Sequence, residues 1–128
     1  MQYENLVSKM MTLNNLGRLY HWATDSAQHH VVFEKFLQEN EQHTDSFVES
    51  ILGNDIAFNI GKLSIISKDD EGYSLEKARQ EISNYRSIVR KFQGELEKIE
   101  DGHSNELTSI LDGVIELSSK TLYLLKLK

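Results

Sequence analysis

The residues that could perform chemistry are histidines and carboxylates in the first half of the chain. His21 and His30 lie on either side of a short polar segment, and Asp45 and Glu49 lie four residues apart. The chain has no cysteine, so imidazole and carboxylate groups are its strong metal ligands. Residues four apart on a helix share one face, so Asp45 and Glu49 could hold a metal ion together. Mixed imidazole and carboxylate ligation suits iron.

The sequence around Asp45 is unusually polar for a helix that faces a core. No apolar residue occurs between Leu37 and Phe47, whereas a core-facing helix normally has one at every third or fourth position. Polar groups must therefore face either the core or another subunit. Buried polar groups are costly without partners. Metal binding is one remedy, and a hydrogen-bond network between subunits is another.

Apolar periodicity predicts four helices, which is the all-α fold class. Apolar residues recur at steps of three and four, the spacing of one helix face. Thr24-Asp25-Ser26 and Ser104 supply N-caps, and Gly53 is a typical residue after a helix end. The absence of proline fits long uninterrupted helices. The predicted helices span residues 3–22, 27–52, 75–99 and the segment from 104 toward the C-terminus.

The connections predict how these helices pack. Short turns at 23–26 and 101–104 favour two antiparallel pairs, and the long segment 54–72 is a crossover between them. Its end, Lys68-Asp69-Asp70-Glu71-Gly72, is expected to be a solvated loop. We therefore predict a ferritin-like antiparallel four-helix bundle in which residues 1–128 form a single domain.

Helix geometry requires two chains for a complete metal site. His21 ends the first helix and His30 opens the second, so a tight turn can bring both imidazoles together. His30 and Asp45 are 15 residues apart on one continuous helix, which is roughly 22 Å. One chain cannot place both on the same ion. In a two-fold dimer with antiparallel second helices, the histidines of one chain could face Asp45 and Glu49 of the other, and two such sites would form.

This pattern resembles the Dps branch of the ferritin-like superfamily, the iron-oxidising proteins of starved bacteria. The resemblance rests on Tyr20-His21-Trp22, His30, Asp45, Glu49 and Leu52-Gly53, and covers about residues 15–53. It implies an iron-oxidising site shared between two subunits, with His21 and His30 from one and Asp45 and Glu49 from its mate. The turn before His30 is short, which leaves His29 as an alternative ligand. The shortened form resembles Dps-like proteins of phage genomes.

Composition and charge argue against several other functions. The chain carries 20 acidic and 14 basic residues, and its modest basic cluster of Arg86, Arg90 and Lys91 argues against nucleic-acid binding. No apolar run approaches the roughly 20 residues of a membrane span, and no signal peptide is evident. We expect a cytoplasmic protein. The alternative to an iron protein is a bundle without iron chemistry that acts as a dimeric protein-interaction module. DNA compaction is a third reading, disfavoured by charge.

Overall fold

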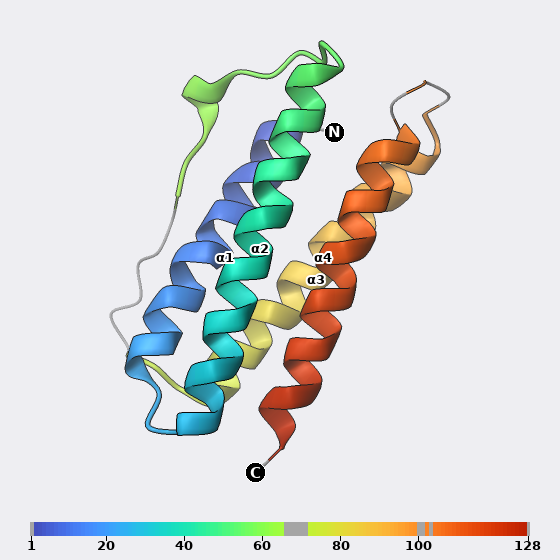
Figure 1. Ribbon diagram of the computed structural model, residues 1–128. Coiled ribbons are helices and arrows are strands. Elements are labelled where there is room, and N and C mark those ends of the chain that lie inside the picture. Colours follow the sequence, from blue (N-terminus) through green and yellow to red (C-terminus); the bar gives the residue numbers. More distant parts are fainter. Residues whose placement is uncertain (1, 66–71, 100–101, 103, 128) are drawn as a thin grey trace.

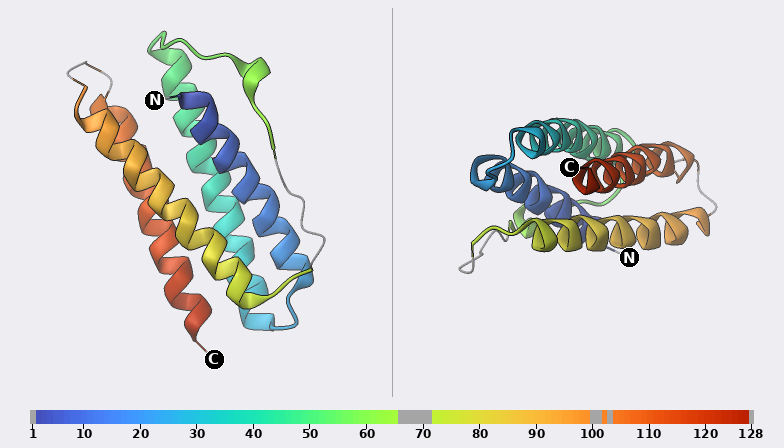
Figure 2. Two further views of the ribbon diagram at one scale, coloured as in Figure 1. Left: turned by 180° about the vertical axis from the view of Figure 1, so that it is seen from behind. Right: turned by 90° about the horizontal axis from the view of Figure 1, so that it is seen from below.

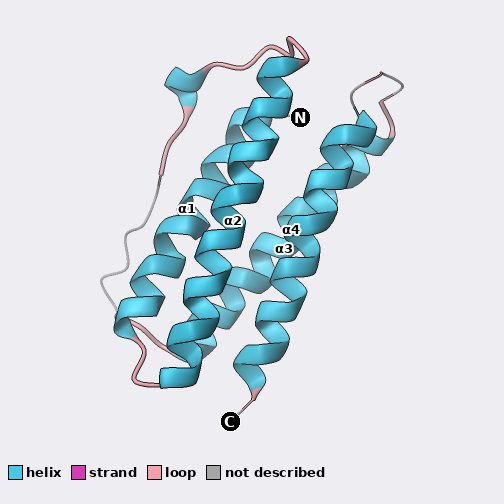
Figure 3. Cartoon of the chain, viewed as in Figure 1, coloured by secondary structure: helices cyan, strands magenta, loops and turns pink. Residues whose placement is uncertain are grey.

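The protein is an all-α bundle of four long helices. The computed structural model describes residues 2–65, 72–99, 102 and 104–127 (Figure 1). No strand occurs among these described residues (Figure 3), so the predicted fold class is confirmed. The helices are α1 (Tyr3–Ala23), α2 (Ala27–Gly53), α3 (Leu75–Glu97) and α4 (Ser104–Lys126), and η1 (Ile60–Lys62) is a short 3₁₀ turn in the crossover.

Serine side chains begin two of these helices where the sequence predicted a start. Ser26 Oγ accepts a hydrogen bond of 3.1 Å from the backbone N–H of His29, and this caps α2. Ser74 Oγ accepts a bond of 3.1 Å from the backbone N–H of Lys77 and caps α3. Each cap satisfies a donor that the first turn of a helix leaves without an intrahelical partner. The α1–α2 turn is therefore only three residues long.

The helices form two antiparallel pairs that pack against each other. α1 contacts α2 and α3, and α4 contacts α2 and α3. Figure 2, viewed from below, shows this four-cornered arrangement with α1 and α4 on one diagonal. The crossover returns the chain along the length of the bundle, so α3 runs in the same direction as α2. The antiparallel packing and the long connection between α2 and α3 are as the sequence predicted.

The crossover is attached to α1 rather than projecting from it. Its backbone N–H groups at Asn59 and Ser64 donate bonds of 2.9 Å each to Glu4 Oε2 and Ser8 Oγ on α1. Phe58 is half-buried against the core. The crossover therefore covers part of the outer face of the α1–α2 pair. The predicted loop at 68–71 lies outside the described residues, as does Asp101 of the predicted α3–α4 turn.

One continuous apolar core runs between the four helices. Ile82 and Leu117, which the helix periodicity places in the core, are 0% and 8% exposed. The steps of three and four in residues 3–22 also place Leu19 on the predicted buried face of the first helix. Its side chain is instead 39% exposed, so this position lies at the edge of the buried stripe. None of the described helices is long and apolar enough to cross a membrane.

A polar network inside the core accounts for part of the polar stretch of α2. Asn40 is fully buried and donates to the Met10 carbonyl (3.1 Å) and to Asn14 Oδ1 (2.7 Å), while Tyr85 donates to Asn40 Oδ1 (2.7 Å). Thr44 Oγ1 donates to the Asn40 carbonyl at 2.7 Å. These inward-facing polar groups thus find partners within a single chain, as buried polar groups require.

Candidate metal centre

Two histidine rings meet where α1 ends and α2 begins. His21 lies in the last turn of α1 and His30 in the first turn of α2. Their ring centroids are 3.7 Å apart and the ring planes differ by 24°, so the imidazoles are stacked. The tight turn held by the Ser26 cap produces this contact. The sequence prediction that these two imidazoles lie together agrees with this geometry, and it is His30 rather than His29 that lies beside His21.

Reciprocal hydrogen bonds orient both rings. His21 Nδ1 lies 2.9 Å from the carbonyl oxygen of His30, and His30 Nδ1 lies 2.8 Å from the carbonyl oxygen of His21. A carbonyl oxygen can only accept, so both Nδ1 atoms carry the hydrogen. In the neutral imidazole the lone pair is then on Nε2. Histidine ligands of metals commonly donate their other ring N–H in this way, which fixes the tautomer and the ring orientation.

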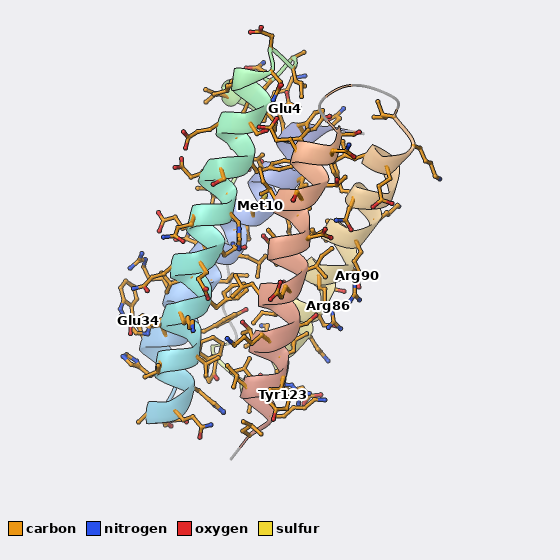
Figure 4. The ribbon with its side chains drawn as sticks, turned by 45° about the vertical axis from the view of Figure 1, so that its right-hand side comes forward. Glu4, Met10, Glu34, Arg86, Arg90 and Tyr123 are labelled. Atoms are coloured by element: carbon orange, nitrogen blue, oxygen red, sulfur yellow. The ribbon has the colours of Figure 1, made fainter. Side chains whose placement is uncertain are left out.

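Glu34 completes a three-residue group with the histidines. One nitrogen from each of His21 and His30 and one carboxylate oxygen of Glu34 all lie within 4.8 Å of one another. A tetrahedral ion with bonds of about 2.0–2.1 Å holds its ligand atoms roughly 3.4 Å apart, so small side-chain movements would suffice. Glu34 is exposed on the side of α2 that faces away from α4 (Figure 4). The three side chains can therefore reach one ion from solvent.

Sequence reasoning did not identify Glu34. An exposed glutamate on a helix is usually part of a solvated face, and nothing in its immediate neighbours distinguishes it. The signal that could have found it is its spacing, because Glu34 follows His30 by four residues and so lies one turn away on the same face.

Asp45 and Glu49 form a separate carboxylate pair on the exposed side of α2. Glu49 lies one turn beyond Asp45 on the same face of α2. Hydrogen bonding with the Asp45 carboxyl group, and next the negative charge of Asp45, raise the pKa of Glu49 above its usual range. No lysine or arginine among the described residues forms an ion pair with either carboxylate. Within the described residues this carboxylate pair thus lacks an ion-paired cation, although Arg18 of α1 lines a groove together with Asp45.

The two groups do not meet within one chain. About four turns of α2 separate His30 from Asp45, so the distance along the helix is roughly 22 Å. A groove of about 470 Å³ between α1, α2 and the crossover includes Asp45 in its wall. Its other walls are largely apolar and include Met11, Val48 and Ile65. The α1–α2 pair thus combines apolar surface with two separate groups of titratable side chains.

His43 belongs to a different environment. Its position in the polar stretch between Leu37 and Phe47 predicts an exposed helix residue, but His43 is half-buried and packs on Gly113 of α4. A Cβ atom built on Gly113 would lie 2.7 Å from His43 Cε1. Burial lowers the pKa of His43, and the charges of Glu39 and Glu116 partly oppose this shift. His43 therefore faces the core side of α2 and is not a candidate ligand.

Comparisons with known proteins do not assign the chain to a family. No protein-family model matches it, and neither a curated protein nor a solved structure is significantly similar to it. The class of protein is thus set by the fold and the site: an all-α antiparallel four-helix bundle with an exposed His/His/Glu group at one end of α2. A functional assignment must come from the chemistry of this group.

Proposed function

We propose that the protein binds a divalent transition metal, with Fe(II) as the physiological ion, at His21, His30 and Glu34. The observation that carries the proposal is the group of two stacked imidazoles and one carboxylate at the α1–α2 turn. The Nδ1 hydrogen bonds leave the lone pair of each neutral ring on Nε2. Two imidazoles and one carboxylate with remaining open positions are the ligand set of many non-haem Fe(II) sites. The resemblance to Dps proteins in the residues around the histidines supports the same ion.

A second copy of the chain would complete the coordination. Asp45 and Glu49 lack a cationic partner among the described residues, and the length of α2 keeps them away from the histidines of their own chain. In a two-fold dimer with antiparallel α2 helices, each histidine group would face the carboxylate pair of the other chain. The iron would then be a substrate that is oxidised from Fe(II) to Fe(III), with dioxygen or peroxide accepting the electrons.

Complementation between two variants tests whether the site is shared. Titration of the wild type with Fe(II) in the absence of oxygen, or with Co(II), is expected to show one metal site per chain. This site should be lost in the double variant His21→Ala/His30→Ala and also in the double variant Asp45→Asn/Glu49→Gln. Neither double variant can form an intact shared site. In an equimolar mixture, half of the dimers are mixed and each has one intact site, so about a quarter of the wild-type sites should return.

The controls separate metal binding from loss of fold or of charge. Glu116 is exposed on α4. Glu116→Gln removes one carboxylate there and should leave the metal titration unchanged. Circular dichroism checks that each variant is folded. If Asp45→Asn/Glu49→Gln binds like the wild type, the site lies within one chain. If the wild type binds no metal, the proposal is wrong.

A dimeric interaction module without iron chemistry is the second candidate. The groove between α1, α2 and the crossover favours it, because Ile60 and Ile65 line this groove and are 63% and 49% exposed. The histidine pair would then act as a clasp between α1 and α2. A dimer in sedimentation equilibrium that persists without any metal binding would select this candidate over the first.

A further inference from the structure

A second candidate site lies on the opposite half of the bundle, between α3 and α4. A groove of about 480 Å³ is formed where side chains at steps of three and four residues on the two antiparallel helices face each other. Ligand pockets of proteins commonly have volumes in this range. The residues on which the inference rests are Arg79, Ser83 and Arg86 of α3 and Ser119, Tyr123 and Lys126 of α4.

The groove is a local concentration of positive charge on an acidic protein. Its walls carry Arg79, Arg86 and Lys126, and Glu76 is the one carboxylate among the residues that line it. The whole chain has a formal net charge of −6. Three cations against one carboxylate leave the groove with excess positive charge, so an anion in the groove would be favoured. A phosphomonoester, which carries about −1.5 to −2 charges near pH 7, matches this excess.

Both arginines have hydrogen-bond donors that lack an acceptor among the described residues. Arg86 donates from one terminal nitrogen to Ser119 Oγ at 3.1 Å, and Arg79 makes no hydrogen bond among the described residues. The Nε atoms of both arginines are buried and lack a partner among the described residues. Buried donors without acceptors are costly. The Nε atoms themselves are closed to solvent, so the donors open to an anion are the terminal guanidinium nitrogens, and arginine recognises phosphate oxygens in pairs.

An aromatic ring stands beside these charges. Tyr123 lines the groove and is 60% exposed, although large aromatic side chains are generally more buried. Figure 4 shows Tyr123 and Arg86 along the same α3–α4 side of the bundle. An exposed ring next to a cationic groove can stack on a planar group attached to the phosphate. We propose that this groove binds a phosphomonoester whose organic group is planar, independently of the metal site.

Binding is measured by calorimetric titration of the full chain with phenyl phosphate, and with inorganic phosphate for comparison. Arg79→Gln and Arg86→Gln are each expected to lower the affinity for phenyl phosphate roughly tenfold or more. Tyr123→Ala is expected to reduce the preference for phenyl phosphate over inorganic phosphate by roughly twofold to tenfold. Arg79→Gln and Tyr123→Ala change groups outside the apolar core, so they keep the test valid if Arg86→Gln fails to fold.

Arg90→Gln is the matched control. Arg90 is exposed one turn beyond Arg86 on α3 and does not line the groove. Its replacement removes the same charge and should change the affinity by less than about twofold. An equal loss of affinity in Arg79→Gln and Arg90→Gln would overturn the proposal, because binding would then reflect diffuse surface charge.

The source of the phosphomonoester is distinguished with vesicles. Phosphatidic acid presents the same chemical group on a lipid surface. Binding to phenyl phosphate in solution assigns a soluble ester. Sedimentation with phosphatidic acid vesicles alone, lost in Arg79→Gln, assigns a lipid headgroup and overturns the planar organic group. Absence of both kinds of binding overturns the proposal.

Discussion

The phenolic hydroxyl of Tyr85 donates a hydrogen bond of 2.7 Å to the side-chain oxygen of Asn40, and both residues are fully buried. This bond connects α3 to α2 across the centre of the bundle. Burial raises the pKa of the Tyr85 hydroxyl, which therefore stays a donor at any ordinary pH. The amide of Asn40 in turn donates to α1. One buried pair thus fixes the relative positions of three helices.

Tyr85→Phe should destabilise the protein, because it leaves the Asn40 oxygen buried without its donor. The expected loss is about 1–3 kcal/mol in the free energy of unfolding by urea. Tyr73→Phe is a matched control, since the Tyr73 hydroxyl is buried and has no hydrogen-bond partner among the described residues. That change should be neutral or slightly stabilising. Equal effects of the two substitutions would show that the Tyr85–Asn40 bond contributes nothing.

Gly17 permits the close approach of α1 to α2 just before His21. A Cβ atom at Gly17 would lie 3.1 Å from Leu37 Cβ, an atom that cannot move without the backbone of α2. Gly17→Ala should therefore cost about 1–3 kcal/mol of stability. Gly94 on α3 has open space around it, and Gly94→Ala should gain about 0.5–1 kcal/mol from helix propensity. Thermal unfolding that shows the same sign for both would contradict this account.

Protonation of His43 should destabilise the bundle. Its pKa is lowered in the folded state by burial, so the unfolded chain binds this proton more readily. The stability contributed by neutral His43 is therefore present above the usual histidine pKa of the unfolded chain. It is lost as the pH falls below that value toward the lowered pKa of the folded state. Urea unfolding at about pH 8 and about pH 5 should show a larger acid-induced loss for the wild type than for His43→Gln. Identical pH profiles would mean that His43 keeps its proton affinity on folding.

The sequence predicts the helices well because their signals are local. The apolar periodicity depends only on residues that are close in the sequence, and so do the caps at Ser26 and Ser74. The two caps mark helix starts that the structure contains. The antiparallel topology followed from the lengths of the connections. Leu19 was misplaced because periodicity defines a stripe, whereas the width of the buried stripe depends on which helices lie beside it.

The site was predictable only where a short connection between two helices sets proximity. The meeting of His21 and His30 followed from a tight turn, but the carbonyl partners of their Nδ1 atoms depend on how α1 and α2 approach each other. The inward role of Asn40 was not predicted either, because its partners come from α1 and α3. Contacts between residues distant in sequence require the packed structure.

The final prediction separates stability from metal binding at Asp45 and Glu49. The pKa of Glu49 is raised in the folded state, so the folded protein binds this proton more readily than the unfolded chain. Stability from this proton is therefore present below the usual glutamate pKa and is lost as the pH rises through the raised pKa. At pH values above the raised pKa of Glu49, the two carboxylates repel each other.

Glu49→Gln replaces the repelling carboxylate with an amide that can donate to Asp45. The metal-free variant should therefore unfold at a higher temperature than the wild type at pH 7, and this advantage should shrink as the pH falls below the usual glutamate pKa. The same substitution should weaken Co(II) binding, because the amide is a poorer ligand than a carboxylate. Higher stability with weaker binding is typical of residues retained for function rather than for folding. A lower unfolding temperature for Glu49→Gln at pH 7 would mean that the carboxylate pair stabilises the fold and needs no metal to explain it.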